Sequence, residues 1–350
     1  GGRTCQRASR GIPDGSFLNC VREDPQKKGL LYACTESGVF VSFNDGDEWQ
    51  PLQLNMPVVS VRDLVIHEDD LVIATHGRSF WILDDASPLR QFDTRVVVAD
   101  AWLFRPQTAL RVHPGSDQGT PKPLDEPLAE NPPDGAILYY CLKEKPPTPA
   151  VLEILDDSDK AIRRFSSDDK TPAVDPNALE IPMYWVRPPE MLSGEPGMHR
   201  FVWDTHYAGP AGLRGGRRGA QGPWAPPGNY TVRLTVNGKS TSQPLVLKVD
   251  PRVKTPGTDL ARQFEISSQL AAGYAEISTA SRQAEGLLAQ MEALAGKFSG
   301  DAALAEALSS LSAKVRGVLG PQREAYGSFG LAVPAGESSD LRSLARAFST

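Results

Sequence analysis

One run of eight residues, Ser-Phe-Asn-Asp-Gly-Asp-Glu-Trp beginning at Ser42, constrains the fold more than any other part of the chain. The side chains of Asn44 and Asp45 accept hydrogen bonds from backbone N–H groups a little further along, which favours a turn. Gly46 tolerates a positive φ that other residues resist, and Trp49 is large enough to fill the hollow beneath a turn. The run therefore predicts a tight turn between two strands of an antiparallel sheet.

Strand-like segments surround this turn and then recur. Short apolar runs rich in β-branched and aromatic residues, separated by turn residues, occur at 17–22, 30–34, 39–43, 49–52, 61–66, 71–75 and 79–83. The first four segments form one repeat and the last three form a second. Aligning the two repeats without gaps places Leu31 on Leu71 and Phe40 on Phe80. This offset lies within the roughly 40–45 residues that a four-stranded propeller blade occupies. We therefore expect residues 1–105 to form about two blades of a β-propeller.

Two blades do not close a ring, because propellers have roughly four to eight. The missing blades are therefore expected as partners of this region, and the sequence leaves two sources open: a longer version of the same chain or a separate subunit. The first residues, Gly-Gly-Arg-Thr-Cys, have no apolar core of a secretion signal.

The character of the chain changes after the repeat. Residues 106–135 are rich in Pro and acidic residues and predict a linker. Alternating runs within 136–252 predict a β-sandwich of the immunoglobulin or fibronectin type III kind. Residues 256–320 show apolar residues at helical spacing with a Gly-containing break, which predicts a helical hairpin that Thr258 caps, and 321–350 form a small polar tail. The expected fold is mainly β, with a partial propeller, a sandwich and a carboxyl-terminal helical hairpin.

Composition limits the function classes. The formal net charge of −6 argues against a general nucleic-acid binder, and neither helical segment is apolar for long enough to span a membrane. The four cysteines show no metal-ligand spacing, so no metal or other cofactor is expected. Cys34 and Cys141 lie in expected strands and are predicted to be free buried thiols, while Cys5 and Cys20 are able to pair if the protein is exported. Their disulfide state stays open.

Several phrases also resemble one family. They are residues 29–33, 61–64, 70–85 and 222–228, together with the Asp-box-like residues Ser42, Asn44, Asp45, Gly46 and Trp49. The chain is similar to the carboxyl-terminal part of bacterial BNR-repeat (Asp-box) "glycosyl hydrolase" proteins, which are sortilin- and xyloglucanase-like propellers. Glu48 stands where the motif usually has Thr or Ser, and Cys34 where Gly is usual. The resemblance implies an exported protein at the cell surface, in the periplasm or outside the cell.

Candidate contact residues for a ligand or partner are Arg62, Asp63, His76 and Arg78. Arg62 and Asp63 open an expected innermost strand, whereas His76 and Arg78 lie at a turn that faces one side of a propeller. The residues assemble no catalytic set, since glycoside hydrolysis usually needs two carboxylates straddling the bond. We therefore expect a non-catalytic scaffold or recognition region that binds protein partners or glycans. The alternative is part of a glycoside hydrolase whose catalytic carboxylates lie in absent blades, which leaves enzyme activity undecided.

Overall fold

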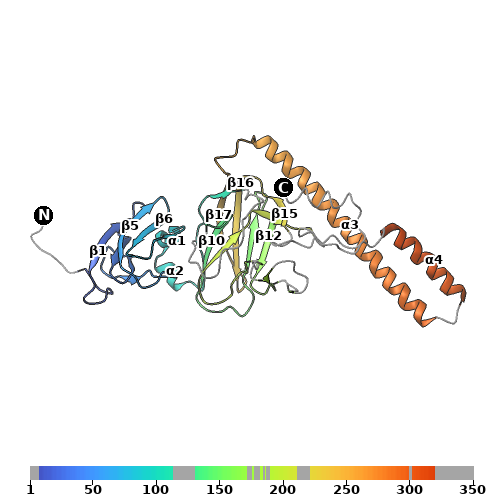
Figure 1. Ribbon diagram of the computed structural model, residues 1–350, viewed down its shortest axis with the longest axis horizontal. Coiled ribbons are helices and arrows are strands. Elements are labelled where there is room, and N and C mark those ends of the chain that lie inside the picture. Colours follow the sequence, from blue (N-terminus) through green and yellow to red (C-terminus); the bar gives the residue numbers. More distant parts are fainter. Residues whose placement is uncertain are drawn as a thin grey trace, which may run out of the picture.

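The computed structural model describes residues 8–112, 131–171, 176, 182, 183, 186, 190–210, 221–298 and 302–319. Three parts follow one another along the long axis of the molecule: an amino-terminal lobe, a central group of sheets, and a long helix that carries a shorter one (Figure 1). The predicted fold class, mainly β with a partial propeller, a sandwich and carboxyl-terminal helices, is confirmed.

The amino-terminal lobe contains two antiparallel sheets. The first consists of β1 (Leu18–Glu23), β2 (Leu31–Thr35), β3 (Val39–Ser42) and β4 (Gln50–Pro51), and the second of β5 (Val61–His67), β6 (Asp70–Thr75) and β7 (Phe80–Leu83). In both sheets the strands follow chain order, as in the blades of a propeller. One face of each sheet packs against the other to form an apolar core that includes Tyr32, Val41, Leu64 and Leu71.

Strand register shows that the two sheets repeat each other. Leu18 pairs with Thr35 and Val61 pairs with Thr75, and each inner strand has an irregularity directly after that pair, at Leu18/Cys20 and at Val61/Asp63. A bulge at the same place in both sheets re-aims the same part of the inner strand. This match supports the predicted repeat on a second, independent feature.

The gapless alignment of the two sheets is wrong by one residue at the outer hairpin. Ala33 pairs with Phe40, whereas its counterpart Ile73 pairs with Trp81. The cause is a longer turn, because the Thr35 N–H reaches Gly38 O but the Thr75 N–H reaches Ser79 O. The structural counterpart of Phe80 is therefore Val39.

The central part is a sandwich around a large apolar core. One sheet has the strand order β12-β11-β16-β17-β9, and a second has the order β13-β10-β8. Their bounds are β8 (Ala101–Leu103), β9 (Ala109–Arg111), β10 (Ala136–Leu142), β11 (Val151–Leu155), β12 (Ala161–Ser166), β13 (Gly197–Trp203), β16 (Gly228–Val236) and β17 (Lys239–Val249). A short hairpin of β14 (His206–Ala208) and β15 (Gln221–Trp224) flanks them. Alternation along β10, with every second side chain buried, explains why this strand sits at the core.

Two strands of the sandwich come from residues that the sequence assigns to other regions. β8 lies in the segment expected to belong to the last blade, and it pairs with β10. β9 lies in the expected linker, and it pairs in parallel with β17. The sandwich sheets therefore include residues that precede position 136.

The helical hairpin consists of α3 (Gly257–Lys297) and α4 (Ala302–Leu319). The ring of Phe264 lies 4.9 Å from the ring of Tyr207, which attaches the start of α3 to the sandwich, and Arg316 pairs with Glu292 at 2.7 Å further along. The predicted cap at Thr258 is wrong by two residues, because Pro256 precedes the helix and offers no side-chain hydrogen bond. Within the described residues, neither helix combines the length and apolar character that crossing a bilayer requires.

Candidate functional site

The inner strands of the two lobe sheets meet along a set of polar side chains. We call this set the polar seam: Asn19, Arg22, Glu36, Arg62 and Asp63. An Arg22 Nη2 atom lies 2.5 Å from Asp63 Oδ1, and Arg62 Nη1 lies 3.6 Å from Glu36 Oε1. The Asn19 amide donates to the Val61 carbonyl at 2.8 Å. The seam therefore joins the first sheet to the second by contacts between residues that lie 26 to 42 positions apart.

The seam contains both inner-strand candidates from the sequence. Arg62 and Asp63 are brought together with Arg22 and Glu36, which the sequence analysis did not single out. Arg62 lies at the bulge of β5, and Asn19 lies at the matching bulge of β1. Sequence alone gives no signal for these partners, because Arg22 and Glu36 do not occupy the repeat positions of Arg62 and Asp63 and only the packing of the two sheets brings them together.

Charge pairing decides what the seam can do chemically. Both carboxylates face a guanidinium, and the Ser60 hydroxyl, followed by Asn19, Arg62 and His76, lowers the pKa of the Glu36 carboxyl. A carboxyl held ionised in this way is a poor general acid, since glycoside hydrolysis needs one carboxyl with a raised pKa. The seam is better suited to holding two sheets together or to hydrogen bonding with a polar ligand.

His76 and Arg78 lie in the exposed turn between β6 and β7. The His76 N–H donates to the Ser60 carbonyl at 2.8 Å, which ties this turn to the segment that enters β5. The Arg78 N–H donates to the Thr75 hydroxyl at 3.2 Å, and its carbonyl accepts from the Trp81 indole at 2.9 Å. The backbones of both residues organise the turn, and His76 lies close enough to Glu36 to act on its charge.

The turn that begins at Ser42 is closed by side-chain acceptors. Ser42 Oγ accepts the Gly46 N–H at 2.9 Å, and Asn44 Oδ1 accepts the Glu48 N–H at 3.0 Å. Asp45 and Gly46 both have positive φ, at 59° and 87°. The buried Trp49 donates its indole N–H to the Ala8 carbonyl at 3.0 Å. The role of these residues is therefore structural, because their contacts shape the outer edge of the first sheet.

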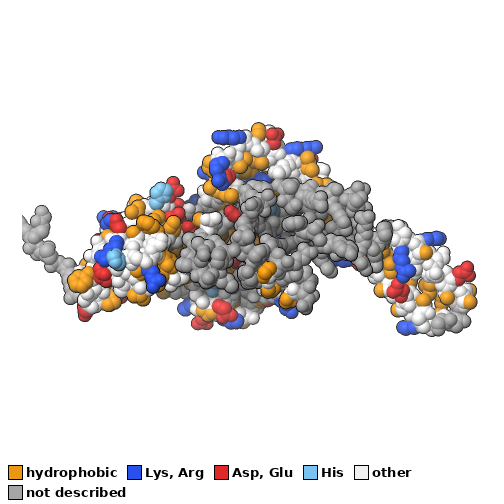
Figure 2. Space-filling model, viewed as in Figure 1, with side chains coloured by type: hydrophobic (Ala, Val, Ile, Leu, Met, Phe, Trp, Pro, Cys, Tyr) orange, Lys and Arg blue, Asp and Glu red, His pale blue; other side chains and the backbone are white. Residues whose placement is uncertain are grey.

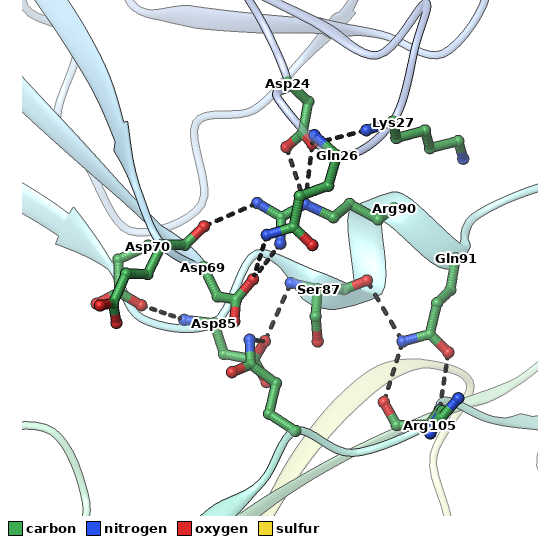
Figure 3. A network of polar contacts seen from close by, with 12 residues as sticks. Asp24, Gln26, Lys27, Asp69, Asp70, Asp85, Ser87, Arg90, Gln91 and Arg105 are labelled. Atoms are coloured by element: carbon green, nitrogen blue, oxygen red, sulfur yellow. Dashed lines mark hydrogen bonds and ion pairs between the residues drawn. The ribbon is translucent and has the colours of Figure 1, made fainter.

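A buried ion pair joins the two sheets at the end of the lobe that faces the sandwich (Figure 3). Arg90, from α1 (Ser87–Gln91), donates its Nε–H to both oxygens of Asp24 at 3.0 Å and also bonds Asp69. The Asp24 side chain is 0% exposed and that of Arg90 is 9% exposed. Asp24 also accepts the backbone N–H groups of Gln26 and Lys27. These partners of Asp24 all belong to the lobe itself. The network therefore holds the two sheets and α1 together.

The second sheet carries an uncovered apolar face. We call it the open face: Val65, Val72, Ala74, Phe80 and Ile82. Val65 pairs with Val72, Val72 with Ile82, and Ala74 with Phe80, so these side chains are neighbours on one side of the sheet. Phe80 is 73% exposed and Ile82 59% exposed. Figure 2 shows hydrophobic side chains on the surface of this lobe.

The described part of the chain offers few groups that could bind a metal ion or a small ligand. No group of three His, Cys, Asp or Glu residues there could hold a metal ion. A hollow of about 190 Å³ lies at the edge of the sandwich, lined by residues of β8, β16 and β17, among them Lys239, and by Asp100 directly before β8. The lining residues offer one carboxylate and one ammonium, which lie 3.7 Å apart and pair with each other.

Comparisons with known proteins do not assign the chain to a family. No protein-family profile matches it, and no curated protein matches it. Among solved structures, it is similar to the extracellular domain of a hybrid two-component system from B. thetaiotaomicron, with a TM-score of 0.17 and 10% identity. The match covers 69% of this chain and 26% of that chain. A TM-score this low carries no argument about fold or function.

Proposed function

We propose that this chain is a non-catalytic scaffold and recognition region of an exported BNR-repeat propeller protein, in which the lobe packs against further blades and the sandwich and helices bind protein partners or glycans. The observation that carries the proposal is the open face. In the first sheet, the equivalent face packs against the second sheet, and Val39 and Val41 are only 0% and 3% exposed. In the second sheet, the counterparts Phe80 and Ile82 are largely exposed.

Two further observations support the same interpretation. The Asp-box-like turn supplies the blade-edge chemistry that the family resemblance implies. The polar seam links successive inner strands, and inner strands line the channel of a propeller. Exposed contiguous apolar surface marks an interaction site. The buried equivalent face of the first sheet supports a further sheet as the partner that covers the open face.

The helical hairpin offers a second surface for partners. Ile266, Ile277, Leu287 and Leu294 of α3 are each about 40% exposed. Within the described residues, Gln263 and Phe264 near the start of this helix contact the sandwich, and its far end packs on α4. An amphipathic helix with apolar residues left uncovered is a common way to bind another protein.

The test is the native mass of the protein purified from its natural source, with peptide mapping of everything that co-purifies. The proposal expects a longer polypeptide, or a bound chain with further Asp-box turns. A stable species that consists of this chain alone would overturn it. The double variant F80D/I82D should lose the bound chain or disrupt the longer protein, whereas the exposed-site control V246D on the sandwich should change nothing.

The hydrolase alternative has a separate test. The complete protein is incubated with a panel of polysaccharides, and new reducing ends are measured. Released product would support the alternative. If product appears, E36Q and D63N distinguish the two sources of activity, because seam carboxylates that only join the sheets leave turnover unchanged when catalysis occurs in other blades.

A further inference from the structure

Cys20 and Cys34 lie directly opposite each other on β1 and β2. Opposed residues of an antiparallel pair have Cα atoms about 4.5–5.5 Å apart and side chains on the same face of the sheet. That separation falls within the range that a disulfide requires, about 4.4–6.8 Å between Cα atoms. The two thiols are close enough for Cys20 to hydrogen bond with Cys34.

We propose that Cys20 and Cys34 form a disulfide that ties β1 to β2 when the protein meets an oxidising disulfide such as glutathione disulfide. Both residues are thiols in the structure. The inference is independent of the proposed function, since it follows from strand register alone. It also replaces the pairing of Cys5 with Cys20 that the sequence left open, although Cys5 lies outside the described residues.

The reaction has a definite order because the two thiols differ in access. Cys34 is fully buried, whereas Cys20 is partly exposed at the margin of the core. The Cys20 thiolate attacks one sulfur of glutathione disulfide, forms a mixed disulfide and releases one glutathione thiolate. The Cys34 thiolate then attacks the Cys20 sulfur and displaces the second glutathione.

The electron balance closes in these two steps. The two protein thiols together lose two protons and two electrons, and glutathione disulfide takes them up as two thiols. Burial, followed by the neighbouring Cys20, raises the pKa of the Cys34 thiol, which makes Cys34 a poor first nucleophile. Cys34 therefore acts as the resolving thiol, already in contact with the sulfur that it must attack.

The bond would act on a vulnerable part of the lobe. β1 is the edge strand of the first sheet, and it exposes apolar residues on either side of Cys20, with Leu18 46% and Val21 45% exposed. A bond from β1 to the buried strand β2 closes a loop of about 15 residues and resists fraying of that edge. Cys141 provides an internal control, because Met198 and Trp102 lie opposite it and neither can pair with it.

The experiment uses the full chain and its tryptic peptides. The protein is incubated with glutathione disulfide, alkylated with N-ethylmaleimide, digested without reduction and mapped by mass spectrometry. The four cysteines fall on separate peptides, and those of Cys5, Cys20 and Cys34 are residues 4–7, 11–22 and 29–62. We expect peptide 11–22 linked to peptide 29–62 with the loss of two hydrogens, and an alkylated Cys141.

Three results would overturn the proposal: alkylation of both Cys20 and Cys34 after oxidation, a link between peptides 4–7 and 11–22, or a lasting glutathione adduct on Cys20 of the unmodified chain. The variant C34A should retain that adduct, and C141S should still form the link. Oxidation should also raise the Tm of the lobe by roughly 10–20 °C in the unmodified chain and in C141S, but not in C34A. Equal Tm values for the oxidised and reduced unmodified chain would contradict the structural effect.

Discussion

The two sheets of the amino-terminal lobe share one design but have opposite surroundings. Both have strands in chain order and a bulge at the same register position, yet Val41 of the first sheet is 3% exposed and its counterpart Ile82 is 59% exposed. The sequence of each strand is apolar on this face in either case. The second sheet therefore has an apolar face suited to burial, and the described part of the chain does not bury it.

The largest difference between the two sheets is expected for a matched pair of substitutions, V41D and I82D. Asp at position 41 places an unpaired charge between the two sheets, and we expect the lobe to lose about 4 kcal/mol or more of unfolding free energy. Asp at position 82 remains in water in the isolated chain and should change stability by less than about 0.5 kcal/mol. Chemical denaturation followed by Trp fluorescence measures both. Equal losses would mean that the two faces are equally buried.

The next largest effect concerns the buried ion pair that locks the two sheets. R90M leaves the Asp24 carboxylate buried without its cation, and removal of one partner of a buried pair costs about 3–5 kcal/mol. R95M is the matched control, because Arg95 in α2 (Thr94–Val98) pairs with Asp93 in the open, and exposed pairs contribute about 0–1 kcal/mol. Urea titration of both variants decides the matter. Similar midpoints would contradict the locking role.

The sequence predicts the parts of this lobe that depend on local chemistry. The turn from Ser42 to Trp49 closes through contacts within a few residues, so its composition was enough to identify it. The ion pair between Asp24 and Arg90 spans 66 positions and leaves no local trace. The longer turn before Ser79 also escaped prediction, because the turns at Gly38 and Gly77 look alike in composition.

The same distinction holds outside the lobe. The alternating pattern of β10 gave its bounds, whereas β8 and β9 are only three residues each and pair with strands far along the chain. Of the candidate site, Arg62, Asp63, His76 and Arg78 were identified as polar residues of exposed turns and strand ends. Their partners Arg22 and Glu36 required the register of the two sheets, which only the fold reveals.

A smaller effect is expected at the turn that the first sheet has and the second lacks. S42A removes the acceptor of the Gly46 N–H, and a buried donor left without a partner costs about 1–3 kcal/mol. The counterpart of Ser42 in the second sheet is Leu83, which has no hydroxyl to offer. S158A at an exposed hairpin tip is the control and should cost less than about 0.5 kcal/mol. A neutral S42A would show that the turn holds without its serine.

The smallest expected effect is a pH dependence of stability that belongs to the sandwich and not to the lobe. Burial lowers the pKa of His206 in β14 and outweighs the neighbouring Asp204, which acts to raise that pKa. The folded sandwich therefore binds the proton less readily than the unfolded chain does. Stability from this residue is present above the unfolded pKa of about 6.5 and is lost as pH falls from there through the folded value. Lowering the pH from 7.5 to 5.5 should therefore reduce the Tm of the sandwich in the unmodified chain more than in H206Q. An identical pH response in H206Q would contradict this assignment.

The central claim is that a further sheet covers the open face in the complete protein. The most direct measurement is hydroxyl-radical footprinting of Phe80 and Ile82, read by mass spectrometry, on protein from its natural source and on the isolated chain. We expect strong labelling of both residues in the isolated chain and protection of both in the natural material, while exposed Leu110 of the sandwich is labelled equally in each. Equal labelling of Phe80 and Ile82 in the two samples would contradict the claim.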